Sequence, residues 1–353
     1  RLYLSMYSFS EIKQVHLEVT ERCNAACPQC PRRIEGGVLN PRLTMAELSL
    51  AQVQQLLAPE FLRQLKKIYL CGNYGDAAAA GDTLGIIRYL RENSPNLQIG
   101  LHSNGSLRNT AWWAELAALI SQNGYARFAI DGLEDTNHIY RRNTDWQTIM
   151  VNARAFIAAG GRAEWDFIVF AHNEHQVEAA RALAAEMGYA AFNVKRTARF
   201  LKREYVSADA PSPVRQRSGA VVSELAPPVS TEHRHPVADA LQSAAEQQQS
   251  YAEFLMNREI SCQVAQSKSL YISARGYVLP CCWLAGMLHN PESTETRQFA
   301  TEFPDLEATG SVDGLKKSLE DIVMGDFFQR AVSSRWPKGS TGRLEVCARV
   351  CGN

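Results

Sequence analysis

The sequence has no excess of charge of either sign, since its 37 Lys and Arg residues equal its 37 Asp and Glu residues. A balanced chain lacks the electrostatic footprint of proteins that bind nucleic acids or anionic membranes. It also lacks an apolar run long enough to cross a bilayer, and residues 1–5 lack the pattern of a signal peptide. These absences predict a cytoplasmic protein with neither a membrane nor a nucleic acid as partner.

Cysteine, by contrast, is plentiful for a cytoplasmic chain. Disulfides are disfavoured in that compartment, so clustered cysteines indicate metal ligands or catalysts. Three lie near the N-terminus, one stands alone and five lie in the last quarter. The nine are Cys23, Cys27, Cys30, Cys71, Cys262, Cys281, Cys282, Cys347 and Cys351. This distribution predicts two metal sites in two regions, with Cys71 as a buried core thiol.

Short strands alternate with helices in the first two hundred residues. Strands are expected at 15–19, 67–70, 98–102, 127–130, 164–170 and 191–194, with helices between them, the first over 45–65. Six β–α units predict an α/β fold with parallel strands and helices outside, as in a partial (β/α)6 TIM-like barrel. Catalytic loops in barrels follow the carboxyl ends of strands, and the first cysteines come directly after the first strand.

The second half of the chain follows a different pattern. Residues 203–235 hold several prolines without periodicity, which indicates a loop or flexible linker. Helical spacing returns at 238–256, and a hairpin is expected over 269–279 with its turn at 274–276. Helices near 315–323 and 327–332 precede the cysteine-bearing tail. The predicted divisions are an extension (1–14), a barrel (15–202), a linker or insert with a helix (203–257) and a small α+β domain (258–353).

The first cysteines form a C-x3-C-x2-C loop at Cys23, Cys27 and Cys30. Three thiolates can hold three irons of a [4Fe–4S] cube and leave the fourth iron without a protein ligand. The alternative is a zinc site or a set of inert thiols. Zinc sites are usually closed by a fourth Cys or His, and the loop contains none, because His16 precedes it on a strand face.

The loop, its place after the first strand and the six β–α units resemble the radical S-adenosylmethionine (SAM) superfamily over residues 15–194. The resemblance implies that SAM binds the open iron through its amino and carboxylate groups. It also implies reductive cleavage of SAM to a 5′-deoxyadenosyl radical that abstracts hydrogen from the substrate. Gln29 departs from the pattern, because the residue before the third cysteine is commonly an aromatic that rests against adenine.

The resemblance also implies SAM-binding positions outside the loop. Gly75 and Asp76 resemble the Gly-Glu-Pro element that meets the SAM amino group, without its proline; Asp76 could instead be a helix N-cap. Ser103 and Asn104 end the third strand, where ribose contacts are expected, although a plain turn explains them too. Arg141 resembles an arginine that clamps the SAM carboxylate, and its alternative is a solvated helix-end arginine.

The C-terminal cysteines resemble the auxiliary-cluster extension called SPASM or, in its shorter single-cluster form, twitch. The ligands that this resemblance implies for one auxiliary [4Fe–4S] cluster are Cys262, Cys281, Cys347 and Cys351. Cys282 is a spare thiol that could replace Cys281. The alternative is a structural zinc on the same four thiolates.

An auxiliary cluster can accept an electron from a substrate radical, which favours a net oxidation: crosslinking, dehydrogenation or bond cleavage. The expected substrate is a ribosomally synthesised peptide; the alternatives are dehydrogenation of a small-molecule intermediate and, without catalysis, a zinc-binding scaffold. About fifteen residues precede the first strand, so a separate leader-peptide-binding protein is expected, besides an external electron donor such as flavodoxin or ferredoxin. A basic run over 195–203 suits an acidic substrate or a solvated face. No residue is predicted for hydrogen transfer.

Overall fold

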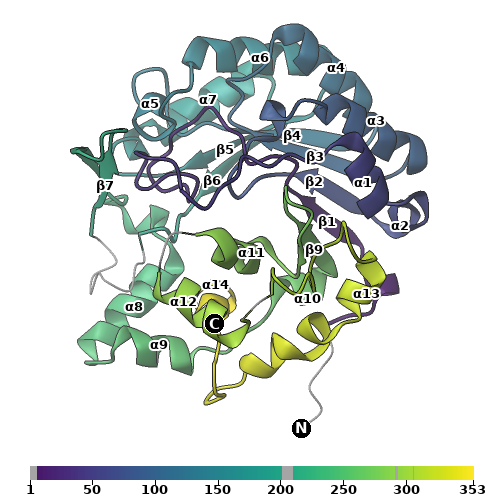
Figure 1. The fold of residues 1–353 in the computed structure, drawn as a ribbon. Helices are drawn as coiled ribbons and strands as arrows, with labels where there is room; N and C mark the ends of the chain where they lie inside the picture. Colours follow the sequence, from purple (N-terminus) through teal and green to yellow (C-terminus); the bar gives the residue numbers. More distant parts are fainter. Residues whose placement is uncertain (1–5, 201–209, 291–292, 305) are drawn as a thin grey trace.

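A computed structural model describes residues 6–200, 210–290, 293–304 and 306–353 (Figure 1). Six parallel strands form the barrel sheet in sequence order. They are β1 (Gln14–Leu17), β2 (Lys67–Leu70), β3 (Gln98–Ser103), β4 (Gly124–Ala129), β5 (Ala163–Ile168) and β6 (Ala191–Lys195). The predicted partial barrel of six β–α units is confirmed.

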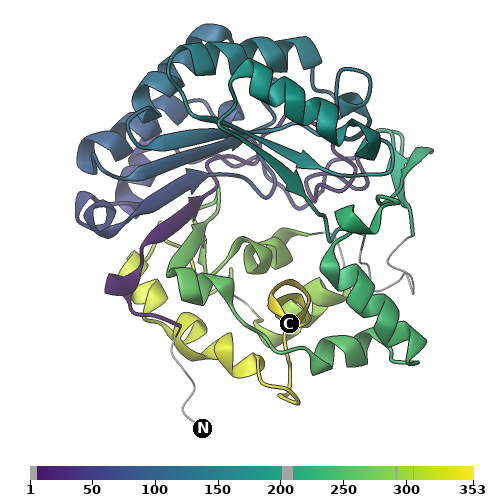
Figure 2. The same ribbon diagram turned by 180° about the vertical axis from the view of Figure 1, so that it is seen from behind.

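Helices on one side of this sheet connect the strands, as Figures 1 and 2 show from opposite directions. They are α1 (Leu50–Leu56), α2 (Pro59–Gln64), α3 (Thr83–Asn93), α4 (Thr110–Ile120), α5 (Asn137–Tyr140), α6 (Trp146–Ala158) and α7 (Val177–Met187). The single helix expected over 45–65 is wrong. It is two helices, because Pro59 cannot continue α1 but suits the first turn of α2.

The two faces of the barrel strands differ in burial. Side chains that face the helices, such as Ile68, Leu101 and Phe167, are fully buried. The alternate positions, such as Tyr69 and His102, face the barrel interior and remain partly exposed. This alternation follows from the two-residue period of a strand, and it places the hydrophobic core between the sheet and its helices.

The linker expected over 203–235 is wrong for most of its described part. Residues Ser212–Arg215 (β7) and Val221–Leu225 (β8) pair as an antiparallel hairpin. Pro213 is compatible with β7 because this strand has a partner on one side only and needs no amide hydrogen bond on the other. The N-terminal part of the expected linker, up to 209, lies outside the described residues.

The C-terminal part of the chain continues the barrel sheet. The predicted hairpin is confirmed as β9 (Ser269–Ile272) and β10 (Val278–Leu279). β9 pairs in parallel with β1, which extends the sheet to eight strands in the order β10-β9-β1-β2-β3-β4-β5-β6. The region predicted as a small domain is therefore built onto the first barrel strand.

The remaining helices lie on the side of the sheet that faces away from α3, α4 and α6 (Figures 1 and 2). They are α8 (Pro236–Glu246), α9 (Tyr251–Asn257), α10 (Gln263–Ser267), α11 (Cys282–His289), α12 (Thr294–Glu302), α13 (Leu319–Val323) and α14 (Glu345–Cys351). A π-helical turn, Phe327–Ala331, stands where the sequence predicts a helix over 327–332. In the described ranges, no helix combines the length and the apolar character needed to span a bilayer.

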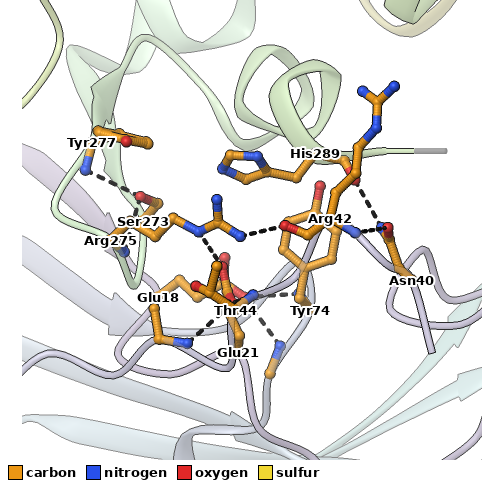
Figure 3. Close-up of polar contacts among 12 residues, drawn as sticks. Glu18, Glu21, Asn40, Arg42, Thr44, Tyr74, Ser273, Arg275, Tyr277 and His289 are labelled. Atoms are coloured by element: carbon orange, nitrogen blue, oxygen red, sulfur yellow. Dashed lines mark hydrogen bonds and ion pairs between the residues drawn. The ribbon is translucent and has the colours of Figure 1, made fainter. Parts of the chain in front are cut away.

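Polar side chains join the hairpin β9–β10 to the loop after β1 (Figure 3). Arg275, in the hairpin turn, donates from Nε to the Glu21 carboxylate at 2.8 Å and from Nη2 to the Arg42 carbonyl at 2.6 Å. The other Glu21 oxygen accepts the Thr44 backbone amide at 3.0 Å. Because the Glu21 side chain is 3 % exposed, this ion pair is shielded from water and fixes the hairpin against the cysteine loop.

Candidate active site

The three N-terminal cysteines lie where β1 ends, and each sulfur has a polar neighbour. Arg141 Nη1 is 3.8 Å from Cys27 Sγ, and Asn104 Nδ2 is 3.7 Å from Cys23 Sγ. Cys30 Sγ is 3.9 Å from the Asn73 carbonyl, in the loop after β2. Loops after four different strands therefore meet at these thiols, at the barrel end where catalytic groups are expected.

Apolar side chains surround the same thiols. They are Ala25, Tyr140, Ile168, Phe170, Phe200, Val214 and Leu225. Burial raises the pKa of Cys27 to about 11 although the Arg141 guanidinium opposes the rise, so the metal-free thiol keeps its proton at neutral pH. Metal binding must displace that proton.

Asp76 organises the loops that follow β2 and β3. Its Oδ1 accepts the Ala78 amide at 2.9 Å, which is the N-cap interaction expected as the alternative to SAM binding. Its Oδ2 accepts the Ser103 hydroxyl at 3.1 Å and the Asn104 amide at 2.8 Å. A carboxylate has about four acceptor positions, so one remains on Oδ1 for a ligand. The predicted residues Asp76, Ser103 and Asn104 thus form one buried group.

Gly75 is required by close packing. A Cβ at this position would lie 1.7 Å from the Thr20 carbonyl oxygen, so no other residue fits between the two loops. The Gly75 amide also donates to the buried Glu18 carboxylate at 3.0 Å. Gly75 therefore positions Asp76 through its backbone.

Arg141 is not a solvated helix-end residue. Its Nε donates to Asp131 Oδ2 at 2.6 Å, and Asp131 itself is fully buried after β4. The other carboxylate oxygen of Asp131 accepts the Ile168 amide at 2.6 Å. Asp131 raises the pKa of Arg141 above its ordinary value, although burial opposes this effect, so the guanidinium stays charged. Sequence reasoning missed Asp131; its position at the end of β4 was the available signal.

Among the described residues, no three His, Cys, Asp or Glu side chains lie close enough together to hold one metal ion. Three thiols on one loop remain compatible with a cubic cluster, in which each thiolate binds a different iron.

Gln29 points toward the hairpin β7–β8. Its Nε2 donates to the Ser212 hydroxyl at 3.4 Å, while its Oε1 is buried with no hydrogen-bond partner among the described residues. Arg142 Nη1 donates to the Arg215 carbonyl at 2.6 Å, so the hairpin is held over the cysteine loop. A buried acceptor without a partner is costly. A ligand that carries an amino group, such as adenine, would satisfy it.

The C-terminal cysteines surround a cavity of about 180 Å³. Its five thiols are those of Cys262, Cys281, Cys282, Cys347 and Cys351, and apolar residues such as Pro280, Leu284, Val346 and Val350 lie among them, together with polar ones such as Gln263 and Ser269. A cavity of this size and lining fits a group that binds sulfur, and so fits an iron–sulfur cluster.

The five thiols differ in their charged neighbours. Burial and the neighbouring thiols Cys281, Cys262 and Cys351 raise the pKa of Cys347 well above its ordinary value. Burial, Cys71 and Glu18 raise the pKa of Cys282 to about 12, and Cys282 in turn contributes to the raised pKa of Cys281. Cys282 therefore adjoins both the other C-terminal thiols and Cys71, and the choice of Cys281 as the ligand stays a prediction.

Cys71 is not the core thiol expected from the sequence. It follows β2 on the interior side, it is partly exposed, and it belongs to none of the hydrophobic clusters. His16, expected on a strand face, is buried with its Nε2 2.6 Å from the Cys71 carbonyl oxygen.

The basic run after β6 does not act as one surface. Lys195 faces the interior with Nζ 3.6 Å from Asp166, whereas Arg199 donates to the Tyr140 hydroxyl at 3.1 Å, close to the cysteine loop. Arg196 is exposed. The last two members, at 202 and 203, lie outside the described residues.

No protein-family model and no curated protein sequence matches the chain. Solved structures do. SuiB from Streptococcus suis, bound to S-adenosylmethionine, superimposes with a TM-score of 0.57 at 12% identity, over 96% of this chain and 72% of SuiB. SuiB bound to precursor peptide SuiA superimposes with a TM-score of 0.56 at 12% identity, over 96% of this chain and 71% of SuiB. The structure of anSMEcpe with bound AdoMet superimposes with a TM-score of 0.52 at 12% identity, over 96% of this chain and 90% of anSMEcpe.

These matches cover both the barrel and the C-terminal extension. The chain therefore has the fold of radical SAM enzymes, as the sequence resemblance predicted.

Proposed function

We propose that the chain is a radical SAM enzyme that oxidatively modifies a ribosomally synthesised peptide. Cys23, Cys27 and Cys30 would hold a [4Fe–4S] cluster that binds SAM. Cys262, Cys281, Cys347 and Cys351 would hold an auxiliary [4Fe–4S] cluster. The chemistry that the SAM-binding cluster supplies when loaded is reductive cleavage of SAM to methionine and a 5′-deoxyadenosyl radical.

The observation that carries this proposal is the convergence of loops at the three thiols. Asn104 and Arg141 follow different strands, and each meets one of the cysteines from its own side. A loop of inert thiols would not require a charged guanidinium beside a buried sulfur. Three thiolates with an arginine alongside match a cluster that keeps one iron for a ligand bearing a carboxylate.

Residues beside the thiols would orient SAM. The Arg141 guanidinium, fixed by Asp131, is charged and can bind the SAM carboxylate by a charge-assisted hydrogen bond. The last acceptor position of Asp76 can bind the SAM amino group, and Ser103 and Asn104 lie beside it for the ribose. The hairpin β7–β8 would limit water access, which protects a radical from stray hydrogen donors.

Two observations support the peptide as substrate and oxidation as the reaction. SuiB, which shares the fold, has been solved with its precursor peptide. The cavity enclosed by the C-terminal thiols also includes Tyr69 and His16 on the inner faces of β2 and β1. An auxiliary cluster there would lie beside the barrel interior and could accept an electron from a substrate radical.

Iron analysis and SAM turnover test the proposal together. Anaerobically reconstituted protein is expected to hold about eight irons, from two cubic clusters, and to convert SAM to methionine and 5′-deoxyadenosine with dithionite. Cys71→Ala is the matched control, because it removes a thiol outside both ligand sets. Stoichiometric zinc without iron at both cysteine groups would instead identify a zinc-binding scaffold.

A further inference from the structure

The interior of the barrel is lined by polar side chains that are only partly buried. Lys67, Tyr69, Cys71, His102, Arg127, Asp166, Asn193 and Lys195 all have intermediate exposure. Side chains fill the interior of a closed TIM barrel, whereas these side chains keep part of their surface accessible to solvent. The interior is therefore suited to a ligand, and its polar groups indicate which kind.

Two cations share one aromatic ring in this interior. Lys67 Nζ and Arg127 Cζ each lie 5.1 Å from the centroid of the Tyr125 ring. Gly100 makes room for that ring, since a Cβ there would lie 2.5 Å from it. Arg127 donates to Glu164 at 2.8 Å. Lys67 has no ion-pair partner among the residues that the structure describes.

The environment of Lys67 disfavours its own charge. Burial, followed by the nearby charge of Arg127, lowers the pKa of Lys67 from its ordinary value. Around Lys67 the cations Arg127, Arg162 and Lys195 already share the two carboxylates of Glu164 and Asp166. Positive charge is therefore left uncompensated, which an anion would neutralise. An unpaired lysine beside an arginine inside a partly accessible barrel is therefore the feature of an anion-binding site.

We propose that Lys67, with Arg127 beside it, binds a carboxylate of the substrate at the floor of the barrel, the end at which β2 begins. This inference rests on the proposed function, because it places the substrate between the barrel floor and the cysteine loop. Nitrogen donors of both side chains supply charge-assisted hydrogen bonds to a carboxylate. Tyr125 and Tyr69 line the floor around them.

The length of β2 then sets the size of the substrate. Lys67 and Cys71 are four residues apart, about 13 Å at ~3.3 Å per strand residue. Directly beyond Cys71, the loop residue Asn73 meets Cys30. An extended peptide covers this distance with about four residues, whereas a single amino acid does not. The carboxylate is thus an acidic side chain, or the chain terminus, about four residues from the modified one.

Aromatic and imidazole rings lie between the barrel floor and the barrel end that carries the cysteine loop. His16, Tyr69, His102 and Tyr125 follow one another across β1 to β4 with centroid separations of 4.5, 5.5 and 5.9 Å. Burial lowers the pKa of His16 to about 4 and that of His102 to about 3, so both rings are neutral at neutral pH. These four rings carry no charge, and the other interior cation, Lys195, is paired with Asp166 at 3.6 Å, which leaves the anchoring of an acidic group to Lys67 and Arg127.

Competition for lysine acylation tests the site without knowledge of the natural peptide. Iron-loaded protein is treated with an acetylating reagent, and modification of Lys67 and of its exposed neighbour Lys66 is measured by mass spectrometry. The probes are acetyl-Ala-Ala-Ala-Glu-amide, its Gln counterpart and acetyl-tetra-alanine with a free carboxyl terminus. We expect the Glu peptide to slow Lys67 modification about tenfold relative to the Gln peptide, as charged hydrogen bonds imply. Lys66 should be unaffected.

The probes also separate the two sources of the carboxylate. Protection by the free-acid peptide and not by the Glu amide would assign the site to a chain terminus. Equal modification of Lys67 with all three probes, or equal protection by Glu and Gln, would overturn the inference. Iron content of the same sample is read separately, so that failure to load iron counts against the proposed function and not against this site.

A second measurement needs no ligand. Lys67→Met should raise the Tm of the ligand-free protein, because it removes one of two neighbouring cations, whereas the control Lys66→Met should leave Tm unchanged. Functional sites commonly trade stability for binding in this way. A lower Tm for Lys67→Met would make Lys67 a structural residue and overturn the inference.

Discussion

The two cysteine groups differ in how the chain builds them. Three N-terminal thiols come from one loop of eight residues, and their neighbours include the charged guanidinium of Arg141. Four C-terminal thiols come from three separate segments and enclose a cavity of about 180 Å³. An open set of three suits binding of a small molecule at the metal, and a closed set of four suits electron transfer. The proposed division of labour between the clusters follows from this difference.

Removing one N-terminal thiol should have the largest effect. Cys27→Ala is expected to abolish 5′-deoxyadenosine formation, because a cube that lacks a ligand loses its reactive geometry, and to reduce iron by about four per chain. Liquid chromatography of the SAM products and iron analysis check this. Unchanged SAM cleavage in Cys27→Ala would falsify the assignment of the first cluster.

Removing two C-terminal thiols should separate the two functions. Cys347→Ala combined with Cys351→Ala should keep SAM cleavage in the absence of substrate, since both residues lie outside the barrel strands. Modified peptide should be lost, because the substrate radical loses its electron acceptor. A circular dichroism melt controls for folding, since loss of a metal site also costs stability. Full product from the folded double variant would make the extension purely structural.

Neighbouring thiols at 281 and 282 provide a finer comparison. Cys281→Ala should lose about four irons, whereas Cys282→Ala should keep about eight, because the charged neighbours of Cys282 include Cys71 and Glu18, which belong to neither ligand set. Electron paramagnetic resonance of the reduced variants identifies which cluster is missing. The opposite result would exchange the two residues as ligands and leave the four-thiol site intact.

The smallest effects are expected at the residues beside the first cluster. Arg141→Lys should weaken SAM binding by roughly 1.5–3 kcal/mol, the range of a charged hydrogen bond, with little change in Tm. Asp76→Ala should weaken SAM binding and also lower the Tm, because its carboxylate holds the Ser103 and Asn104 loop as well as the predicted SAM amino group. Isothermal titration of SAM and thermal melts measure the two effects. Wild-type affinity in both variants would leave these residues with structural roles only.

Local patterns in the sequence predicted the barrel and the cysteine loop well. Alternation of apolar residues marked the strands, because one face of each strand packs on helices. The pairing of β9 with β1 was not predictable in this way, since it joins residues more than 250 positions apart. Hairpin β7–β8 was missed because Pro211 and Pro213 are typical of loops. The partners of Arg141 and Asp76 depend on loops that only the folded barrel brings together.

The position of β1 between β2 and β9 has a consequence for how the protein is made. Val15 pairs with Ile68 on one side and with Leu270 on the other, so the strand that precedes the cysteine loop is completed only after residue 270 has been synthesised. Contacts between such distant segments are slow to form, because a long loop must close first. Until then the edge of β1 stays unpaired and the Glu21–Arg275 ion pair is absent. Cluster insertion during synthesis would therefore meet an incomplete site, and nascent chains that end before residue 269 should load the N-terminal cysteines poorly.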